Sequence, residues 1–185
     1  METQTVNAGS QSKQFGMPVD YAEPLWYVVY TSANHEKRVA EQLRLRDVEH
    51  FLPLYASLRH WKDRRVTLQM PLFPGYVFVR FALRNRFQVL QIPGIVHLVS
   101  FGGQPVPLPE GDLHAIQNCL NHGNRVEPYP YLQAGRSAIV KSGPLRGLEG
   151  IILRMKNRTC FILSFDLMMR SVAVEIDGAD LAPSI

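Results

Sequence analysis

The segment Pro71–Phe81, PLFPGYVFVRF, constrains the fold of this chain more than any other. It joins a Pro-Phe-Pro-Gly corner to an alternating run in which Tyr76 and Phe78 share one face of a strand. Proline and glycine at the entrance of a strand interrupt regular pairing, so the corner marks where the strand begins. The segment therefore predicts a strand entered through a stiff turn that holds aromatic side chains.

Helix and strand patterns alternate around this segment. Apolar runs of strand length predict strands at Leu25–Tyr30, His50–Leu58 with a break at Pro53, Gly75–Leu83 and Ile95–Phe101, and a hairpin over Arg59–Met70 that turns near Lys62 and Asp63. Helical patterns cover His35 to about Val48, Asn85–Ile92 and the residues that follow Leu108. In the first helix, Val39 and Leu43 form the apolar stripe, and Glu36 is expected among the polar residues around it. This order favours an α+β fold, an α/β sandwich with helices packed on a mainly antiparallel sheet.

The carboxy-terminal part has a different pattern. Four short β runs, SAIVKSG, LEGIILRM, TCFILSF and SVAVEID, follow one another within about 50 residues, which is typical of a small all-β barrel. The polar stretch Asn121–Gly135 between the two parts contains two prolines and two glycines and reads as a linker. We therefore expect a tail over 1–24, a first domain over 25–121, a linker over 122–134 and a second domain over 135–185.

Composition argues against several protein classes. No apolar run reaches the ~20 residues of a membrane span, and the polar first segment lacks a secretory pattern. The two cysteines, Cys119 and Cys160, form no disulfide framework, which favours a reducing, cytoplasmic location. Cys119 and His122 have metal-like spacing but no second ligand pair nearby, so no metal and no cofactor is expected. The scattered histidines and the missing phosphate loop and nucleophile elbow argue against an enzyme.

Several segments together resemble one family. WYVVYTSANHEKRVAEQL, PLFPGYVFVRF, QIPGIVHLVSF and LPEGDLHAI resemble, in the same order, the amino-terminal domain of NusG-type proteins. VKSGPLRGLEGIILRMKNRTCFILSF resembles a KOW motif, which forms a small SH3-like barrel. The resemblance covers nearly all of Trp26–Leu181. It implies a NusG-family transcription elongation factor, or one of the family's specialised antitermination paralogues.

This resemblance implies that the first domain grips the clamp helices of RNA polymerase with an apolar concavity. The residues that match it are Leu72, Phe73, Pro74, Gly75, Tyr76 and Phe78, with Tyr30 and Ile95 as weaker candidates. Aromatics on a stiff corner lose little entropy on binding, which suits a hot spot. The alternative interpretation is that Phe78, and one of Phe73 and Tyr76, belong to the core.

Two further surfaces are expected. Candidates for contact with nucleic acid in the elongation complex are Lys37, Arg38, Arg44, Arg59, Lys62, Arg64 and Arg65, since cations bind phosphate; a solvated hairpin is the alternative. In the KOW part, the resemblance implies a partner surface for Rho or a small-subunit ribosomal protein. Met168, Met169 and Arg170 stand there, where the family usually has phenylalanine and glycine, and the alternative is that the barrel core buries one methionine.

The expected function is that of a monomeric two-domain factor without catalysis, which binds polymerase with one domain and recruits a partner with the other. A KOW-type RNA- or ribosome-binding protein without a polymerase role is the alternative. Net charge is only +4, from 20 basic and 16 acidic residues, and does not separate the two. The pattern also leaves open whether DNA sequence is read and whether termination is promoted or opposed.

Overall fold

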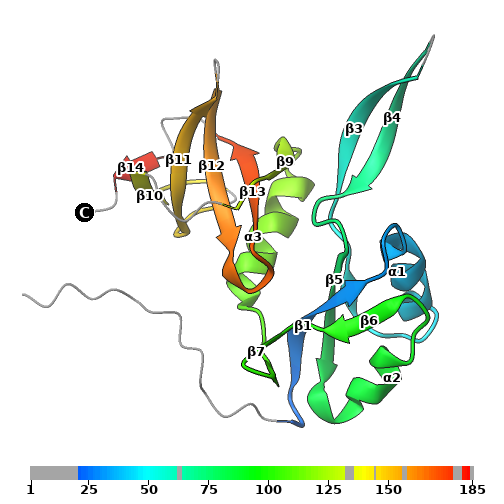
Figure 1. Cartoon of the computed structure of the whole chain (residues 1–185). Helices are drawn as coiled ribbons and strands as arrows, with labels where there is room; N and C mark the ends of the chain where they lie inside the picture. Colours follow the sequence, from blue (N-terminus) through cyan, green and yellow to red (C-terminus); the bar gives the residue numbers. More distant parts are fainter. Residues whose placement is uncertain are drawn as a thin grey trace, which may run out of the picture.

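The computed structural model of the chain describes residues 21–61, 64–131, 136–143, 145–155, 158–176 and 181–183 (Figure 1). Most of the expected tail and the hairpin turn with Lys62 and Asp63 lie outside these ranges. No helix in the described part is long and apolar enough to cross a membrane. The described residues also contain no group of three or more His, Cys, Asp or Glu side chains placed to hold a metal ion.

Four antiparallel strands form the first sheet, in the order β2-β5-β1-β6. The strands are β1 (Pro24–Thr31), β2 (His50–Phe51), β5 (Tyr76–Ala82) and β6 (Ile95–Leu98). The central strands β1 and β5 are mostly buried, as their bulky side chains require. β2 is a short strand at the edge of the sheet and ends at Phe51, ahead of the break expected at Pro53.

Helices cover the first face of this sheet. They are α1 (Glu36–Arg44) and α2 (Arg86–Leu90), the latter preceded by the 3-10 turn η1 (Leu83–Asn85). Val39 and Leu43 of α1 join Tyr27, Val29 and Val77 of the sheet in one buried cluster. α1 is shorter than the expected helix because Asp47, with φ 54°, has left-handed backbone that cannot continue it.

The second face of the sheet packs against α3 (Glu110–Asn121) and the carboxy-terminal part. Trp26, Val28 and Phe78 lie on this face because their positions alternate with those of the first cluster. Leu113 and Ile116 of α3 belong to the same buried cluster. The sheet is therefore covered on both sides, which confirms the layered α+β class.

Two hairpins extend from this body. The larger is the ribbon of β3 (Leu54–Trp61) and β4 (Arg64–Pro71), which stands away from the sheet (Figure 1). The smaller joins β7 (Ser100–Phe101) to β8 (Gln104–Pro105) through two glycines. The hairpin expected over Arg59–Met70 is thus longer than its sequence pattern indicated, because β3 starts directly after Pro53.

The carboxy-terminal part is an antiparallel six-stranded sheet in the order β14-β10-β11-β12-β13-β9. Its strands are β9 (Val126–Tyr129), β10 (Arg136–Val140), β11 (Glu149–Met155), β12 (Arg158–Phe165), β13 (Arg170–Glu175) and β14 (Leu181–Pro183), with the 3-10 turn η2 (Asp166–Met168) before β13. The run TCFILSF is strand, as its β-branched and aromatic residues favour. The expected all-β character of this part is confirmed.

β9 lies inside the segment expected to be a linker. It pairs along the whole of Val126–Tyr129 with β13. The Glu175 N–H also donates to the Arg125 carbonyl oxygen at 3.0 Å, next to this pairing. Residues 122–125 alone separate α3 from β9. Because β9 occupies the edge of β13, the expected linker contains a strand of the carboxy-terminal sheet.

Candidate functional site

The Pro-Gly corner is a tight turn between Phe73 and Tyr76. The Tyr76 N–H donates to the Phe73 carbonyl oxygen at 3.0 Å, and Gly75 has φ 85°. A type II turn requires positive φ at its third position, which glycine adopts readily, and proline is common at its second position. The sequence PLFPGY therefore specifies this turn, and the turn fixes the direction in which β5 leaves it.

Two hydrogen bonds hold Gly75 in place, and the ring of Tyr30 limits the space beside it. Its N–H donates to Oε1 of Glu36 at 2.7 Å, and its carbonyl oxygen accepts the Thr31 N–H at 2.8 Å. A Cβ atom added at Gly75 would lie 3.0 Å from Cε2 of Tyr30, so no larger residue fits without displacing this ring. The corner is consequently fixed to both α1 and β1.

Glu36 is buried, with 5% of its surface exposed, and its expected place among the solvent-facing residues is wrong. It shares the stripe of Val39 and Leu43, because positions i, i+3 and i+7 lie on one helix face. The spacing was visible in the sequence. The hydrogen-bond partner of Glu36, the Gly75 N–H, could not be seen in the sequence, because it lies 39 residues further along the chain.

The aromatic residues of the corner are mostly core. Phe78 is fully buried and Phe73 is 1% exposed. Their rings meet edge to face with centroids 5.4 Å apart, and Phe78 stacks on Phe51 at 6.1 Å. Leu72 is buried as well. In this arrangement of the chain, Phe73 and Phe78 are thus buried in the core, as the alternative interpretation of the sequence expected.

A partly open aromatic row lies beside this core. Tyr76, Tyr30 and His97 are neighbours on β5, β1 and β6, with Tyr30 in the middle. The ring centroids are 5.4 Å apart for Tyr30 and Tyr76 and 5.1 Å apart for Tyr30 and His97. Tyr30 is 38% exposed. Ile95 does not join the row, because it packs against the cluster on the opposite, helix-covered face.

The carboxy-terminal sheet covers one end of this surface. Phe165, the last residue of β12, meets Phe73 edge to face with centroids 5.1 Å apart. Cζ of Arg170 lies 5.8 Å from the ring centroid of Tyr76, within cation–π range. Sequence reasoning missed Phe165 and His97, since a contact between distant segments leaves no local pattern.

The candidate partner surface of the KOW part is at the same place. Met168 is 3% exposed and belongs to the core, while Met169 is 56% exposed with left-handed backbone, φ 51°. The structure therefore presents one methionine rather than two. Arg170 next to it is the residue that reaches Tyr76, so the two candidate surfaces touch each other.

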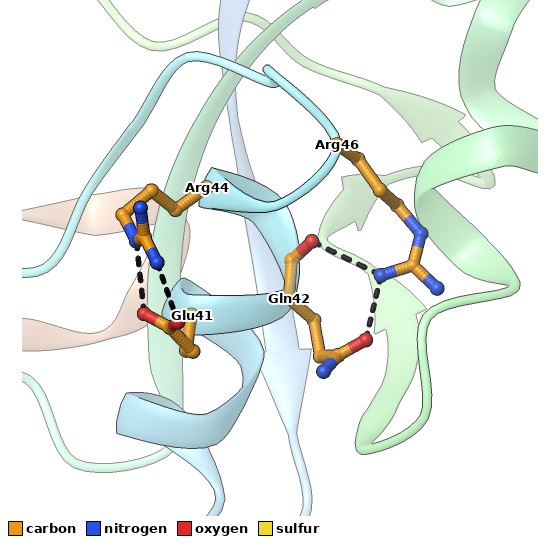
Figure 2. Close-up of polar contacts among 4 residues, drawn as sticks. All are labelled: Glu41, Gln42, Arg44 and Arg46. Atoms are coloured by element: carbon orange, nitrogen blue, oxygen red, sulfur yellow. Dashed lines mark hydrogen bonds and ion pairs between the residues drawn. The ribbon is translucent and has the colours of Figure 1, made fainter.

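The basic candidates fall into two groups. On α1, Arg44 forms a bidentate ion pair with Glu41, at 3.0 Å and 2.7 Å, and Figure 2 shows the two side chains facing each other beside the Gln42–Arg46 pair. This pair satisfies part of the charge of Arg44. Lys37 donates from Nζ to the Gln69 carbonyl oxygen at 2.6 Å and so ties α1 to the ribbon. Arg38 is exposed.

The second group stands at the far end of the ribbon. Arg59, Arg64 and Arg65 are all exposed. They lie on β3 and β4 next to the turn, and Lys62 falls outside the described residues. The structure thus brings the three arginines together, well separated from the aromatic row.

Cys119 is a core thiol. It is fully buried on α3, and burial raises its pKa to about 12. The thiol therefore stays protonated near neutral pH, whereas metal binding requires the thiolate. Its sequence neighbour His122 is exposed and has its Nδ1 2.7 Å from the Asn118 carbonyl oxygen.

Comparison with known proteins places these features in a family context. Residues 24–117, just over half of the chain, match the family model described as transcription termination factor nusG. The transcription termination/antitermination protein NusG of Borreliella burgdorferi is 21% identical over 175 residues, covering 82% of this chain and 94% of that protein. The corresponding protein of Rickettsia felis is 22% identical over 139 residues, covering 69% and 72%.

A solved structure shares the fold. It describes a domain interaction in Thermotoga maritima NusG and matches with a TM-score of 0.55 at 20% identity, covering 88% of this chain and 98% of that one. At this identity the match shows likeness of fold. The match extends over both the mixed sheet and the carboxy-terminal sheet, since it covers nearly the whole of each chain.

Proposed function

Because the chain belongs to the NusG family of transcription termination and antitermination factors, we propose that its amino-terminal domain binds the clamp helices of RNA polymerase. The binding surface consists of the second sheet face around the Pro-Gly corner, with Tyr76, Tyr30 and Phe73 as its aromatic anchors. The two domains of this proposal are the expected ones, 25–121 and 135–185, with β9 (Val126–Tyr129) added to the second because it pairs with β13. The protein acts in the cytoplasm as a monomer and performs no catalysis.

The rigidity of the corner carries this proposal. Gly75 is held by hydrogen bonds to Glu36 and Thr31, and the ring of Tyr30 leaves little room for a side chain there, so the aromatics on either side of it lose little freedom when they bind. Preorganised aromatic side chains are the usual hot spots of protein interfaces. The row of Tyr76, Tyr30 and His97 extends this apolar surface across three strands and remains partly exposed.

Polymerase binding at this surface requires the carboxy-terminal sheet to move. Phe73 is buried under Phe165 and Tyr76 lies beneath Arg170. A clamp helix and the carboxy-terminal sheet compete for the same rings. The clamp helix binds only molecules whose carboxy-terminal sheet has moved off these rings, which we call the open arrangement, and so it shifts the population toward that arrangement. The closed arrangement lowers the apparent affinity by the fraction of molecules that are open.

Opening also frees the proposed partner surface of the second domain. Met169 and Arg170 are already exposed, but Arg170 lies over the ring of Tyr76, so release of that contact frees the Arg170 side chain together with the anchors. Rho or a small-subunit ribosomal protein would bind there. Because the second domain is tethered to the polymerase-bound first domain, a partner that it binds is held near the transcribing complex. This raises the partner's effective concentration there without any new contact.

The proposal is tested by titrating the chain with the isolated clamp-helix hairpin of the cognate polymerase. Tyr76→Ala and Tyr30→Ala should each weaken binding, whereas Tyr21→Ala, a similarly exposed tyrosine elsewhere, should not. Circular dichroism of each variant confirms that it is folded. Absence of binding by the natural chain would contradict the proposal and favour a KOW-type RNA-binding protein without a polymerase role.

A further inference from the structure

The β3–β4 ribbon is an unusually independent element. Its two strands pair over eight positions, from Leu54 opposite Pro71 to Trp61 opposite Arg64. Eight residues of strand span about 27 Å, and in Figure 1 the ribbon points away from the rest of the chain. Two-stranded ribbons are marginally stable alone. This one is tied at its base, by Lys37 to Gln69 and by the Leu72 N–H to the Pro53 carbonyl oxygen.

The described part of the ribbon is purely cationic. Over residues 54–61 and 64–71 it carries Arg59, Arg64 and Arg65 and no aspartate or glutamate. None of the ion pairs among the described residues involves these three side chains. Some described arginines elsewhere do have acidic partners, as Arg44 has Glu41, Arg80 has Glu49 and Glu110, and Arg125 has Glu127. The positive charges of these three arginines therefore have no acidic partner among the described residues.

The register distributes this charge over both faces. Arg59 lies opposite Val66, and Arg64 lies opposite Trp61, two positions further along the same face. Arg65 lies opposite His60 on the other face. The exposed leucines are divided in the same way, with Leu68 on the face of Arg59 and Leu58 on that of Arg65. A ligand that pairs with all three arginines must therefore present negative charge on both sides of the ribbon.

We propose that the part of this ribbon that carries Arg59, Arg64 and Arg65 lies in the major groove of duplex DNA; this rests on the proposed function, which brings the chain to the DNA of an elongation complex. Strands about 4.8 Å apart fit a groove about 12 Å wide, which is known to admit a two-stranded ribbon. One face of the ribbon then turns to the base edges, and the phosphate rows run along its two edges, where the long arginine side chains of both faces can reach them. Because Leu58 and Leu68 lie on opposite faces, one of the two adds apolar contact to the base edges.

This geometry distinguishes duplex DNA from other nucleic acids. The major groove of A-form RNA is deep and too narrow for side chains to read, so duplex RNA should not accept the ribbon. A single strand presents one line of phosphates and would leave one face of the ribbon unpaired. The proposal thus predicts a preference for duplex DNA over duplex RNA and over single strands of the same sequence.

The test measures fluorescence anisotropy of labelled nucleic acids with the full chain over a series of salt concentrations. Arg59→Ala, Arg64→Ala and Arg65→Ala should each lower the affinity for duplex DNA several-fold and reduce the slope of log K against log salt by about one. Arg125→Ala removes an equal charge from an arginine paired with Glu127 outside the ribbon, and it should change neither quantity.

A modified duplex tests the groove itself. Glucosylated hydroxymethylcytosines fill the major groove and should abolish the part of the binding that depends on the three arginines, whereas a minor-groove ligand should leave it intact. Equal binding of duplex RNA, tighter binding of the single strand, or unchanged affinity of all three variants would overturn the proposal. The same variants should bind the clamp-helix hairpin normally, so failure of the polymerase proposal and failure of this one are observed separately.

Discussion

Phe165 of β12 meets Phe73 of the Pro-Gly corner edge to face, with ring centroids 5.1 Å apart and ring planes at 77°. Such aromatic pairs contribute about 0.5–1.5 kcal/mol beyond the area that they bury. An interaction of this size can hold two domains together and still yield to a partner that binds either ring. The contact joins the two parts of the chain at the place where each carries its proposed binding surface.

Replacing Gly75 by alanine should destabilise the first domain. Gly75 has φ 85°, which disfavours a side chain, and a Cβ atom would lie 3.0 Å from Cε2 of Tyr30. We expect Gly75→Ala to lower the free energy of unfolding by about 1–3 kcal/mol, measured by urea denaturation followed by circular dichroism.

Gly111→Ala provides the matched control. Gly111 lies in α3, and a Cβ atom added there would have no neighbouring atom within 4 Å, so alanine should stabilise the helix by about 0.5–1 kcal/mol. Equal urea midpoints for the two variants would show that the corner tolerates a side chain and is not fixed as described.

Glu36 should stabilise the corner through its hydrogen bond to the Gly75 N–H. Glu36→Ala leaves this buried donor without its partner and should cost about 1–3 kcal/mol. Glu36→Gln keeps an acceptor oxygen and should cost less. Both are measured by the same urea denaturation.

The control for Glu36 is Glu41→Ala on the same helix. Glu41 is exposed and pairs with Arg44 (Figure 2), an exposed pair of a kind that typically contributes less than about 1 kcal/mol. If Glu36→Ala were no more destabilising than Glu41→Ala, the buried hydrogen bond would not be what holds the corner.

Tyr27 should make the stability depend on alkaline pH. Burial, with smaller effects of Tyr21 and Glu23, raises its pKa from 10.0 to about 12. Below pH 10 the phenol is neutral in both states and its contribution to stability is complete. Between pH 10 and about 12 the unfolded phenol ionises first, so stability falls as pH rises.

Tyr27→Phe tests this pH dependence. The Tyr27 hydroxyl is buried without a hydrogen-bond partner among the described residues, so its removal should not destabilise the chain at neutral pH. The variant should lose stability less steeply above pH 10 in thermal unfolding. Identical pH profiles for the variant and the natural chain would contradict the assignment to Tyr27.

The sequence predicted the features that local patterns determine. Alternation in YVFVRF identified β5, and PLFPGY identified the turn, because proline and glycine restrict the backbone at fixed positions. The break between β2 and β3 followed from Pro53, which cannot donate to regular strand pairing. The all-β character of the second part followed from its β-branched and aromatic runs, such as TCFILSF.

Features that depend on distant contacts were not predictable in this way. Val126–Tyr129 has a proline and polar surroundings and reads as linker, yet it pairs with β13 because that edge is open to it. Phe73 is buried by Phe165, 92 residues further along the chain, and nothing near either residue indicates the other. Glu36 lay on a visible stripe but was read as polar surface because its partner is equally remote.

The most direct test of the account compares the natural chain with Phe165→Ala in a titration with the clamp-helix hairpin. Loss of the Phe165 ring weakens the closed arrangement, so the variant should bind at least about twofold more tightly, and more so if the carboxy-terminal sheet loosens further. Binding by the variant that is equal to or weaker than that of the natural chain would contradict the claim that the carboxy-terminal sheet and the polymerase compete for the rings of Phe73 and Tyr76.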